Sequence, residues 1–166
     1  MATFRADCNG CCGLCCVVPD FFAAQGFGVD KPAETACANL DGFHRCAIHA
    51  TRQTHGYTAC GGFDCFGAGQ WITQTLFKGA HWNDSPGLAR LMFAAYRHWL
   101  PQFEAAALIE AALPYVREDT KSALISTMTA LTSVDSTGQL QPTDASQLRR
   151  ETLEMIRAAL RTMEDG

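Results

Sequence analysis

Cysteines dominate the chemistry that this sequence can perform. The chain opens with "MATFRADCNGCCGLCCVVPDFF", a stretch that contains five of its nine cysteines, and no cysteine follows Cys65. Two consecutive pairs, Cys8/Cys11 and Cys12/Cys15, have C-x2-C spacing. This spacing lets two thiolates converge on one metal while backbone N–H groups turn toward the sulfurs, as in zinc and iron–sulfur sites. The cysteine pattern therefore predicts metal binding.

The number of thiols predicts more than one site. A tetrahedral zinc ion or a four-iron cluster takes about four protein ligands, so eight or nine thiols suit two sites, or one site plus a polynuclear cluster. The adjacent Cys15 and Cys16 point in different directions, which lets them serve separate metals or bridge between them. Cys46-x2-His49 also has ligand spacing, and a neutral imidazole binds zinc well. A histidine that caps a nearby loop is an equal alternative for His49.

Disulfides are the less favoured interpretation of these cysteines. Their number is odd, and direct neighbours in the chain do not readily bridge each other. No apolar run approaches the ~20 residues that span a bilayer, and no basic segment followed by an apolar one marks a secretory signal. The sequence therefore predicts a cytoplasmic protein without a membrane partner, in a compartment where thiols stay reduced.

The residues alone leave the metal open. Thiolate-rich sites suit zinc, iron–sulfur clusters and copper(I) alike. The glycines of "CNGCCGLCC" disfavour the helical cysteine spacing of copper storage, and they let backbone amides approach sulfur, which favours iron–sulfur modestly. Six phenylalanines near the cysteines are expected to form a dry shell, and Arg52 is a candidate donor to sulfur. The phenylalanines are Phe21, Phe22, Phe27, Phe43, Phe63 and Phe66.

Composition and motifs disfavour several other classes of function. The formal net charge is -4 with scattered Lys and Arg, so no electrostatic footprint for nucleic acid is present. An H-E-x-x-H helix, a G-x-S-x-G elbow and a P-loop are missing from the sequence. Gly67-Ala68-Gly69 is expected to allow a tight bend beside Cys65, capped by Asp64. An enzyme is therefore the least favoured hypothesis, whereas a protein partner and the oligomeric state stay open.

The elements that must position the cysteines fall into two regions. Residues 1–75 are rich in Cys and Gly and lack a sustained period, which predicts an irregular, metal-stabilised module. Residues 76–166 are expected to form about four helices packed on that module, giving a mainly α fold. Ser85 or Asp84 is the expected N-cap of the helix that begins near Pro86, and a loop is predicted around Gly138. The expected helical runs are Trp71–Phe77, which continues from the module, then Asn83–Phe103, Pro101–Leu113, Glu118–Ser133 and Asp144–Met163.

The cysteine block also resembles a known family. The C-x2-C-x3-CC block and the later "CANLDGFHRCAIHATRQTHGYTACGGFDCFGAGQ" resemble the CxxCxxCC cysteine-cluster proteins, described as zinc- or iron-chelating, and especially an actinobacterial-type branch often named after pentapeptide repeats. The resemblance covers roughly residues 6–75. It implies eight metal ligands, which are Cys8, Cys11, Cys15, Cys16, Cys37, Cys46, Cys60 and Cys65.

Two departures from the family pattern limit what the resemblance implies. The usual first block is C-x2-C-x2-CC, and the extra residue here makes Cys12 the odd thiol, with Cys12 and His49 as reserve ligands. Residues 76–166 lack the repeats of longer relatives, so no repeat-solenoid role is implied. A flagellin lysine N-methylase carries a similar block, and the family's association with iron–sulfur clusters implies a 4Fe-4S cofactor ahead of zinc. A redox, sensing or metal-handling role is expected. The first alternative is a structural zinc module in a protein–protein interaction, and the second is a modifying enzyme.

Overall fold

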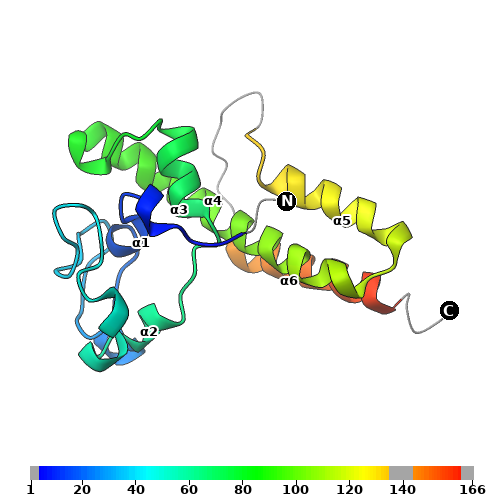
Figure 1. Cartoon of the computed structure of the whole chain (residues 1–166), viewed down its shortest axis with the longest axis horizontal. Coiled ribbons are helices and arrows are strands. Elements are labelled where there is room, and N and C mark those ends of the chain that lie inside the picture. The colour runs from blue at the N-terminus through cyan, green and yellow to red at the C-terminus, as the bar shows by residue number, and fades with distance from the viewer. Residues whose placement is uncertain (1–3, 135–143, 162–166) are drawn as a thin grey trace. The chain divides into compact units, whose positions relative to one another are not determined.

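The computed structural model describes residues 4–134 and 144–161, and within these ranges it contains helices and turns but no β-strand (Figure 1). Two isolated antiparallel bridges, Phe21↔Lys31 and Leu40↔Cys46, are the β-type pairings found there. The mainly helical fold class is confirmed. The loop predicted around Gly138 lies outside the described residues. The α-helices are α1 (Leu14–Val17), α2 (Thr58–Gly61), α3 (Ala68–Trp71), α4 (Pro86–Ala112), α5 (Glu118–Leu131) and α6 (Ala145–Arg161).

The chain forms two compact units. One, the cysteine-rich unit, comprises Arg5–Arg97, and the other, the helical unit, comprises His98–Gly166 with the first four residues. The boundary lies later than the division at residue 75 used in the sequence analysis, because residues beyond 75 bond back to the cysteine segment. Trp82 Nε1 donates to the Cys12 carbonyl oxygen at 2.9 Å, and the Arg97 guanidinium lies 2.8 Å from the Glu34 carboxylate.

Helix α4 runs without interruption where the sequence predicted two helical runs. It spans 27 residues with Pro101 inside it. An interior proline removes one hydrogen bond and clashes with the preceding turn, at a cost of about 3 kcal/mol. Buried residues on both sides, including Met92 in one unit and Ile109 in the other, offset that cost. Among the described residues, three α-helices therefore follow residue 76, and the expectation of about four was wrong.

The start of α4 follows the capping prediction. The Ser85 hydroxyl accepts a hydrogen bond from the Leu88 amide at 3.1 Å, and Pro86 is the first helical residue, where its missing N–H costs nothing. Within this half of the helix the buried stripe includes Met92 and Tyr96. The spacing of Leu88, Leu91 and Met92 in the sequence predicts that Leu91 faces inward. It is instead 60% exposed, because it lies about 100° around the helix from Met92.

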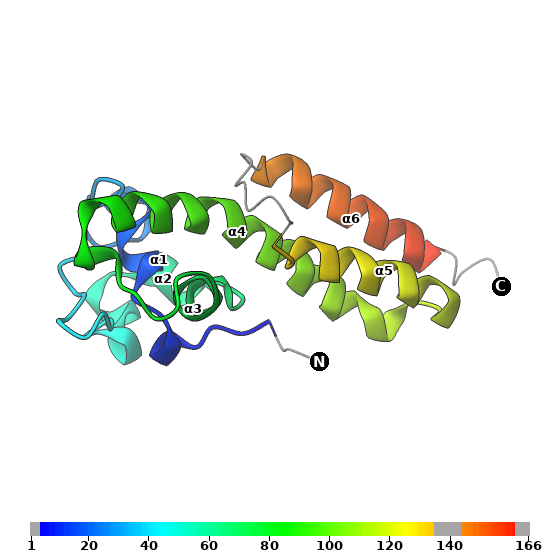
Figure 2. The ribbon, with the colours of Figure 1, turned by 90° about the horizontal axis from the view of Figure 1, so that it is seen from above.

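The helical unit has an apolar core shared by three helices. Figure 2 shows α5 and α6 alongside the second half of α4. The Asp144 carboxylate caps α6 by accepting from the Gln147 amide at 2.9 Å. The hydrophobic period of the sequence predicts that Leu160 faces inward together with Ile156. It is exposed, because Thr152, Ile156 and Ala159 form the buried stripe of α6 instead. The core residues are Ile109, Ala112, Leu113, Val116, Leu124, Ile156 and Ala159.

The cysteine-rich unit is built from short helices and turns. Its α3 continues into a single π-helical turn, Ile72–Leu76, so the predicted helical run over Trp71–Phe77 is largely present. Leu14 and Val17 of α1 and Ile72 of the π-helical turn are fully buried. None of the described helices of either unit is long and apolar enough to cross a bilayer.

Candidate metal centre

Two of the predicted ligands face the start of α3. Gly67 has a φ of 95° at the N-cap of this helix, which makes the predicted bend directly after Cys65, and the Asp64 carboxylate accepts from the Phe66 amide at 2.7 Å. A Cβ placed on Gly69 would lie 2.8 Å from Cys11 Sγ and 3.6 Å from Cys65 Sγ. The missing side chain of Gly69 therefore makes room for both sulfurs, although these cysteines are far apart in sequence.

Cys8 and Cys15 belong to the same neighbourhood. Burial raises the pKa of the Cys8 thiol, and the nearby Cys65 and Cys16 raise it further. The pKa of Cys15 lies well above its ordinary value, first because of its hydrogen bond with Cys16 and of burial, and then because of charges at Cys16, Cys11 and Cys65. We call the Tyr96 set the two thiols that face Gly69 together with Cys8 and Cys15, whose pKa values Cys65 raises. Its members are Cys8, Cys11, Cys15 and Cys65.

Tyr96 of α4 contributes a buried hydroxyl to this neighbourhood. The residue is 3% exposed, and its hydroxyl oxygen has no hydrogen-bond partner in the part of the chain that the structure describes. Its pKa is raised well above the ordinary value, mainly by burial and then by charges at Cys15, Cys65, Cys11 and Cys16. Sequence reasoning missed Tyr96. Its place four residues after Met92 on the buried stripe of α4 was the available signal.

The remaining thiols gather around a different apolar cluster. Phe21, Cys37 and Tyr57 form a buried group against which Cys16 and Cys60 pack. The Cys37 amide donates to the Cys16 carbonyl oxygen at 2.9 Å, which ties the two segments together.

Cys46 joins this second group. Burial raises the pKa of Cys60, and charges at Cys16, Cys37 and Cys46 raise it further. Burial likewise raises the pKa of Cys46, with hydrogen bonding from the Ile48 backbone opposing it and with charges at Cys16 and Cys37 reinforcing it. We call this group the Lys31 set. Its members are Cys16, Cys37, Cys46 and Cys60.

Lys31 places a buried cation beside the second set. It is 6% exposed, and its Nζ donates to the carbonyl oxygens of Val17, Pro19 and Pro32 at 3.2, 2.5 and 3.0 Å. Its Nζ also lies 4.5 Å from the centroid of the Phe21 ring. Burial lowers the pKa of Lys31, whereas charges at Cys37 and Cys16 oppose that shift. The sequence analysis did not single out this lysine, because nothing in its local pattern distinguishes it from an exposed one.

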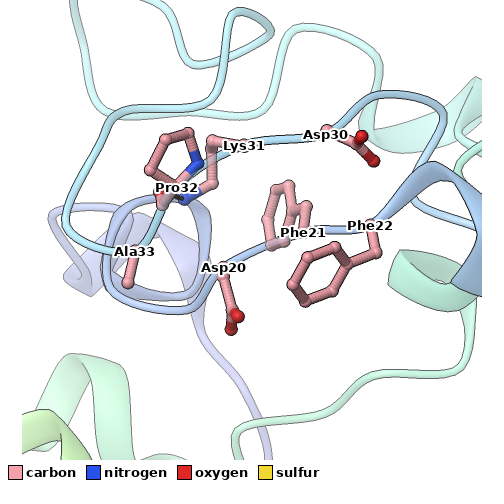
Figure 3. Close-up of a pocket in the computed structure, with 7 residues that line it drawn as sticks. All are labelled: Asp20, Phe21, Phe22, Asp30, Lys31, Pro32 and Ala33. Carbon is pink, nitrogen blue, oxygen red and sulfur yellow. Dashed lines mark hydrogen bonds between the residues drawn. The ribbon is translucent and has the colours of Figure 1, made fainter.

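The same segments line a surface pocket. Figure 3 shows the residues that surround it, which come from the two segments joined by the Phe21↔Lys31 bridge. The Asp30 carboxylate accepts from the Ala23 amide at 2.7 Å, so it serves the local turn. The pocket lining is Asp20, Phe21, Phe22, Asp30, Lys31, Pro32 and Ala33.

Cys15 and Cys16 join the two sets. Their sulfur atoms lie 3.9 Å apart in a thiol–thiol hydrogen bond. That bond, with the cations Lys31 and Arg52, lowers the pKa of Cys16. The charge of Arg52 also opposes the pKa rises of the Cys8, Cys46 and Cys60 thiols.

The two reserve ligands have different surroundings. Cys12 is completely buried; its Sγ lies 3.4 Å from Thr73 Oγ1, and its amide donates to the same oxygen at 3.3 Å. It therefore sits in the apolar core as a small hydrogen-bonded residue. His49 is exposed at the start of a 3-10 turn, and its amide donates to the Cys46 carbonyl oxygen at 3.1 Å. The buried histidine of this unit is His44, whose Nε2 lies 3.1 Å from Asn83 Oδ1.

The expected phenylalanine shell is only partly present. The rings of Phe21 and Phe27 stack with centroids 4.5 Å apart beside the Lys31 set. Phe22, Phe43 and Phe63 are exposed instead, Phe43 by 84%. Their proximity in sequence to cysteines therefore does not bury them.

The thiols are grouped but do not form a closed coordination sphere. All nine cysteines are free of disulfides. Within residues 4–134 and 144–161, no three or more Cys, His, Asp or Glu side chains are arranged to hold a metal ion. A metal would therefore require rotation of thiols within each set.

Comparison with known proteins gives one informative similarity. The chain is 38% identical over 91 residues to the uncharacterized protein YybG of Bacillus subtilis (strain 168), a match that covers 55% of this chain and 33% of that protein. The chain thus spans about a third of the length of this relative. No protein-family model and no solved structure matches it.

Proposed function

We propose that the cysteine-rich unit binds metal through the thiols of the Tyr96 and Lys31 sets, with Cys12 and His49 outside the sites. One observation carries the proposal: Cys11 and Cys65 both face Gly69, and Cys16 and Cys60 pack beside Cys37, whereas Cys12 is hydrogen-bonded to Thr73 in the core. Four thiolates are the donor set that zinc and iron–sulfur clusters use. The resemblance to the CxxCxxCC cysteine-cluster proteins agrees with it.

Backbone amides near the sulfurs support the fit. Burial raises the pKa of Cys11 to about 12, while hydrogen bonding from the Leu14 and Gly13 backbone opposes the rise. The Ile48 backbone acts in the same way on Cys46. Amides that stabilise the thiolate form of a cysteine also stabilise a metal-bound sulfur. The C-x2-C segment therefore has the local donors that a metal site needs, and rotation of side chains completes the sphere.

We favour an iron–sulfur cluster, of the 4Fe-4S type, over zinc. Amide donors and a dry shell such as Phe21 and Tyr57 are what hold and tune such clusters. When bound, a cluster would supply electron transfer or sensing, and zinc would supply a structural cross-link. The proposed compartment is the cytoplasm, because metal ligation needs reduced thiols. The proposal includes no nucleic acid or membrane partner, and it makes no enzymatic claim.

A structural zinc module is the second candidate. The buried residues of the apolar group beside the Lys31 set are Phe21, Cys37 and Tyr57, with Phe27 and Ile48 partly buried against them, which is a small apolar surface for a segment of loops. Under this alternative the metal completes the core, and the helical unit presents a surface to a protein partner.

The test is the metal content of protein purified without oxygen. Iron with inorganic sulfide and a broad visible absorption would support a cluster, and a colourless protein with stoichiometric zinc would support the structural module. Cys8→Ser and Cys60→Ser, one from each set, are expected to lose metal and thermal stability together, since binding and folding are coupled at such sites. Cys12→Ser is the matched control and should keep its metal. Full metal content in both ligand variants would refute the proposal.

A further inference from the structure

We infer that the Tyr96 set and the Lys31 set form two separate metal centres, and that the Tyr96 hydroxyl donates a hydrogen bond to a sulfur of the first centre only. The inference rests on the proposed function and assigns which thiols share a centre. It goes beyond the spacing pattern, which permits two sites or a single polynuclear one.

The chain path separates the two sets. The sulfurs of Cys11 and Cys65 face Gly69 of α3. Cys37 instead is buried with Phe21 and Tyr57, with Cys16 and Cys60 packed against them. Each set is thus assembled on its own part of the unit.

Consecutive residues connect the sets without merging them. Cys15 and Cys16 lie next to each other in α1, and their sulfurs are 3.9 Å apart. Besides its hydrogen bond with Cys16, Cys15 is influenced by Cys11 and Cys65, whereas Cys16 packs with Cys37 and Cys60. Neighbouring side chains on a helix point in directions about 100° apart. One cysteine of the pair therefore serves each centre, and the two centres are close neighbours.

The two sets also have different polar surroundings. A divalent metal with four thiolates carries two negative charges, which a buried site must offset. The Lys31 ammonium is fixed by three carbonyl oxygens beside the second set, so it offsets that charge directly. The Tyr96 hydroxyl provides the first set with a neutral donor instead.

The unpartnered hydroxyl is the observation that points to a ligand. A buried O–H without a hydrogen-bond partner is unfavourable and rare in folded proteins. Tyr96 is 3% exposed; the charged neighbours that raise its pKa are Cys15, Cys65 and Cys11 of the first set and, with the smallest effect of the four, Cys16 of the second. Closure of these thiols on a metal would give the hydroxyl a sulfur acceptor. Such outer hydrogen bonds orient ligands and change the electronic properties of the metal.

The experiment uses the full chain, stripped of metal without oxygen and loaded with Cd²⁺ alone. Cadmium-113 NMR of the wild type should give two resonances with the shifts of thiolate-rich sites. Cys11→Ser/Cys65→Ser should remove one of them, and Cys37→Ser/Cys60→Ser should remove the other. Cys12→Ser should keep both. A single resonance in the wild type would overturn the assignment. The loss of both resonances in each double variant, together with a shift of both resonances in Tyr96→Phe, would overturn it as well.

Tyr96→Phe keeps every thiol and so tests the assignment even if the double variants fail to fold. Only the resonance that depends on Cys11 and Cys65 should shift, and the other should stay in place. Tyr115→Phe is the matched control, because Tyr115 is 68% exposed and belongs to the helical unit. Two unchanged resonances in Tyr96→Phe would refute the hydrogen bond. If the wild type binds no cadmium, the proposed function itself fails, which is distinguishable from a wrong pairing.

Discussion

The two units of this chain are held together in different ways. In the helical unit, one apolar cluster that includes Ile109, Leu124 and Ile156 joins α4, α5 and α6. In the cysteine-rich unit, the apolar groups are interrupted by thiols, and single polar residues such as Lys31 connect segments through several hydrogen bonds. We expect burial of apolar side chains to stabilise both units, since the cysteine-rich unit also buries Leu14, Val17 and Ile72, and we expect only the cysteine-rich unit to depend on its thiols as well.

Removal of metal should have the largest effect and should separate the two units. Structural metal sites contribute on the order of 10 kcal/mol to folding. Stripping the metal with a chelator under reducing conditions should therefore expose the backbone amides of the cysteine-rich unit, while those of the helical unit stay protected. Hydrogen exchange, resolved by peptide, is the measurement. Equal loss of protection in both units would show that the helical unit also depends on metal.

Ile109→Ala tests the opposite side of the comparison. Ile109 is fully buried in the core of the helical unit, and a cavity of this kind costs about 2–4 kcal/mol. The urea midpoint of the helical circular-dichroism signal should fall, whereas the metal content stays unchanged. Met155→Ala is the control, because Met155 is 38% exposed on the same unit. A loss of metal as large as the loss of stability would contradict the separation of the two units.

Gly69→Ala should have a smaller effect on stability but should act on the metal site. The new Cβ would lie 2.8 Å from Cys11 Sγ, so this sulfur must move, at a cost of about 1–3 kcal/mol. Metal affinity measured by competition with a chromophoric chelator should fall as well. Gly42→Ala provides the control, since nothing lies within 4 Å of its added Cβ. Wild-type affinity in Gly69→Ala would mean that Cys11 is not held against α3.

Cys12→Ala should have the smallest effect and distinguishes a core cysteine from a ligand cysteine. The change removes the thiol contact with Thr73 Oγ1, worth about 1 kcal/mol. The thermal midpoint should fall slightly, and the number of metal equivalents per chain should not change. A lower metal stoichiometry would instead place Cys12 among the ligands.

Sequence reasoning was most successful where the signal was local. The cap at Ser85 and the bend at Gly67 both follow from residues within one turn of each other, and both are present. The same reasoning predicted two helical runs that meet at Pro101, whereas α4 is continuous. The residues next to a proline do not show how much apolar surface the helix buries on either side of it. Leu91 and Leu160 were assigned to the wrong face of their helices for a related reason. Which side of a helix is buried depends on the surface packed against it.

Sequence alone was enough to single out the nine thiols and to predict a mainly helical chain with an irregular start, because cysteine spacing and hydrophobic periodicity are properties of neighbouring residues. The tertiary structure decided which thiols lie together. Cys65 approaches Cys11 because α3 presents Gly69 to both sulfurs, and Tyr96 reaches the same place from α4. Lys31 reaches the other set through a bridge to Phe21. These approaches join residues distant in sequence, and only the path of the folded chain determines them.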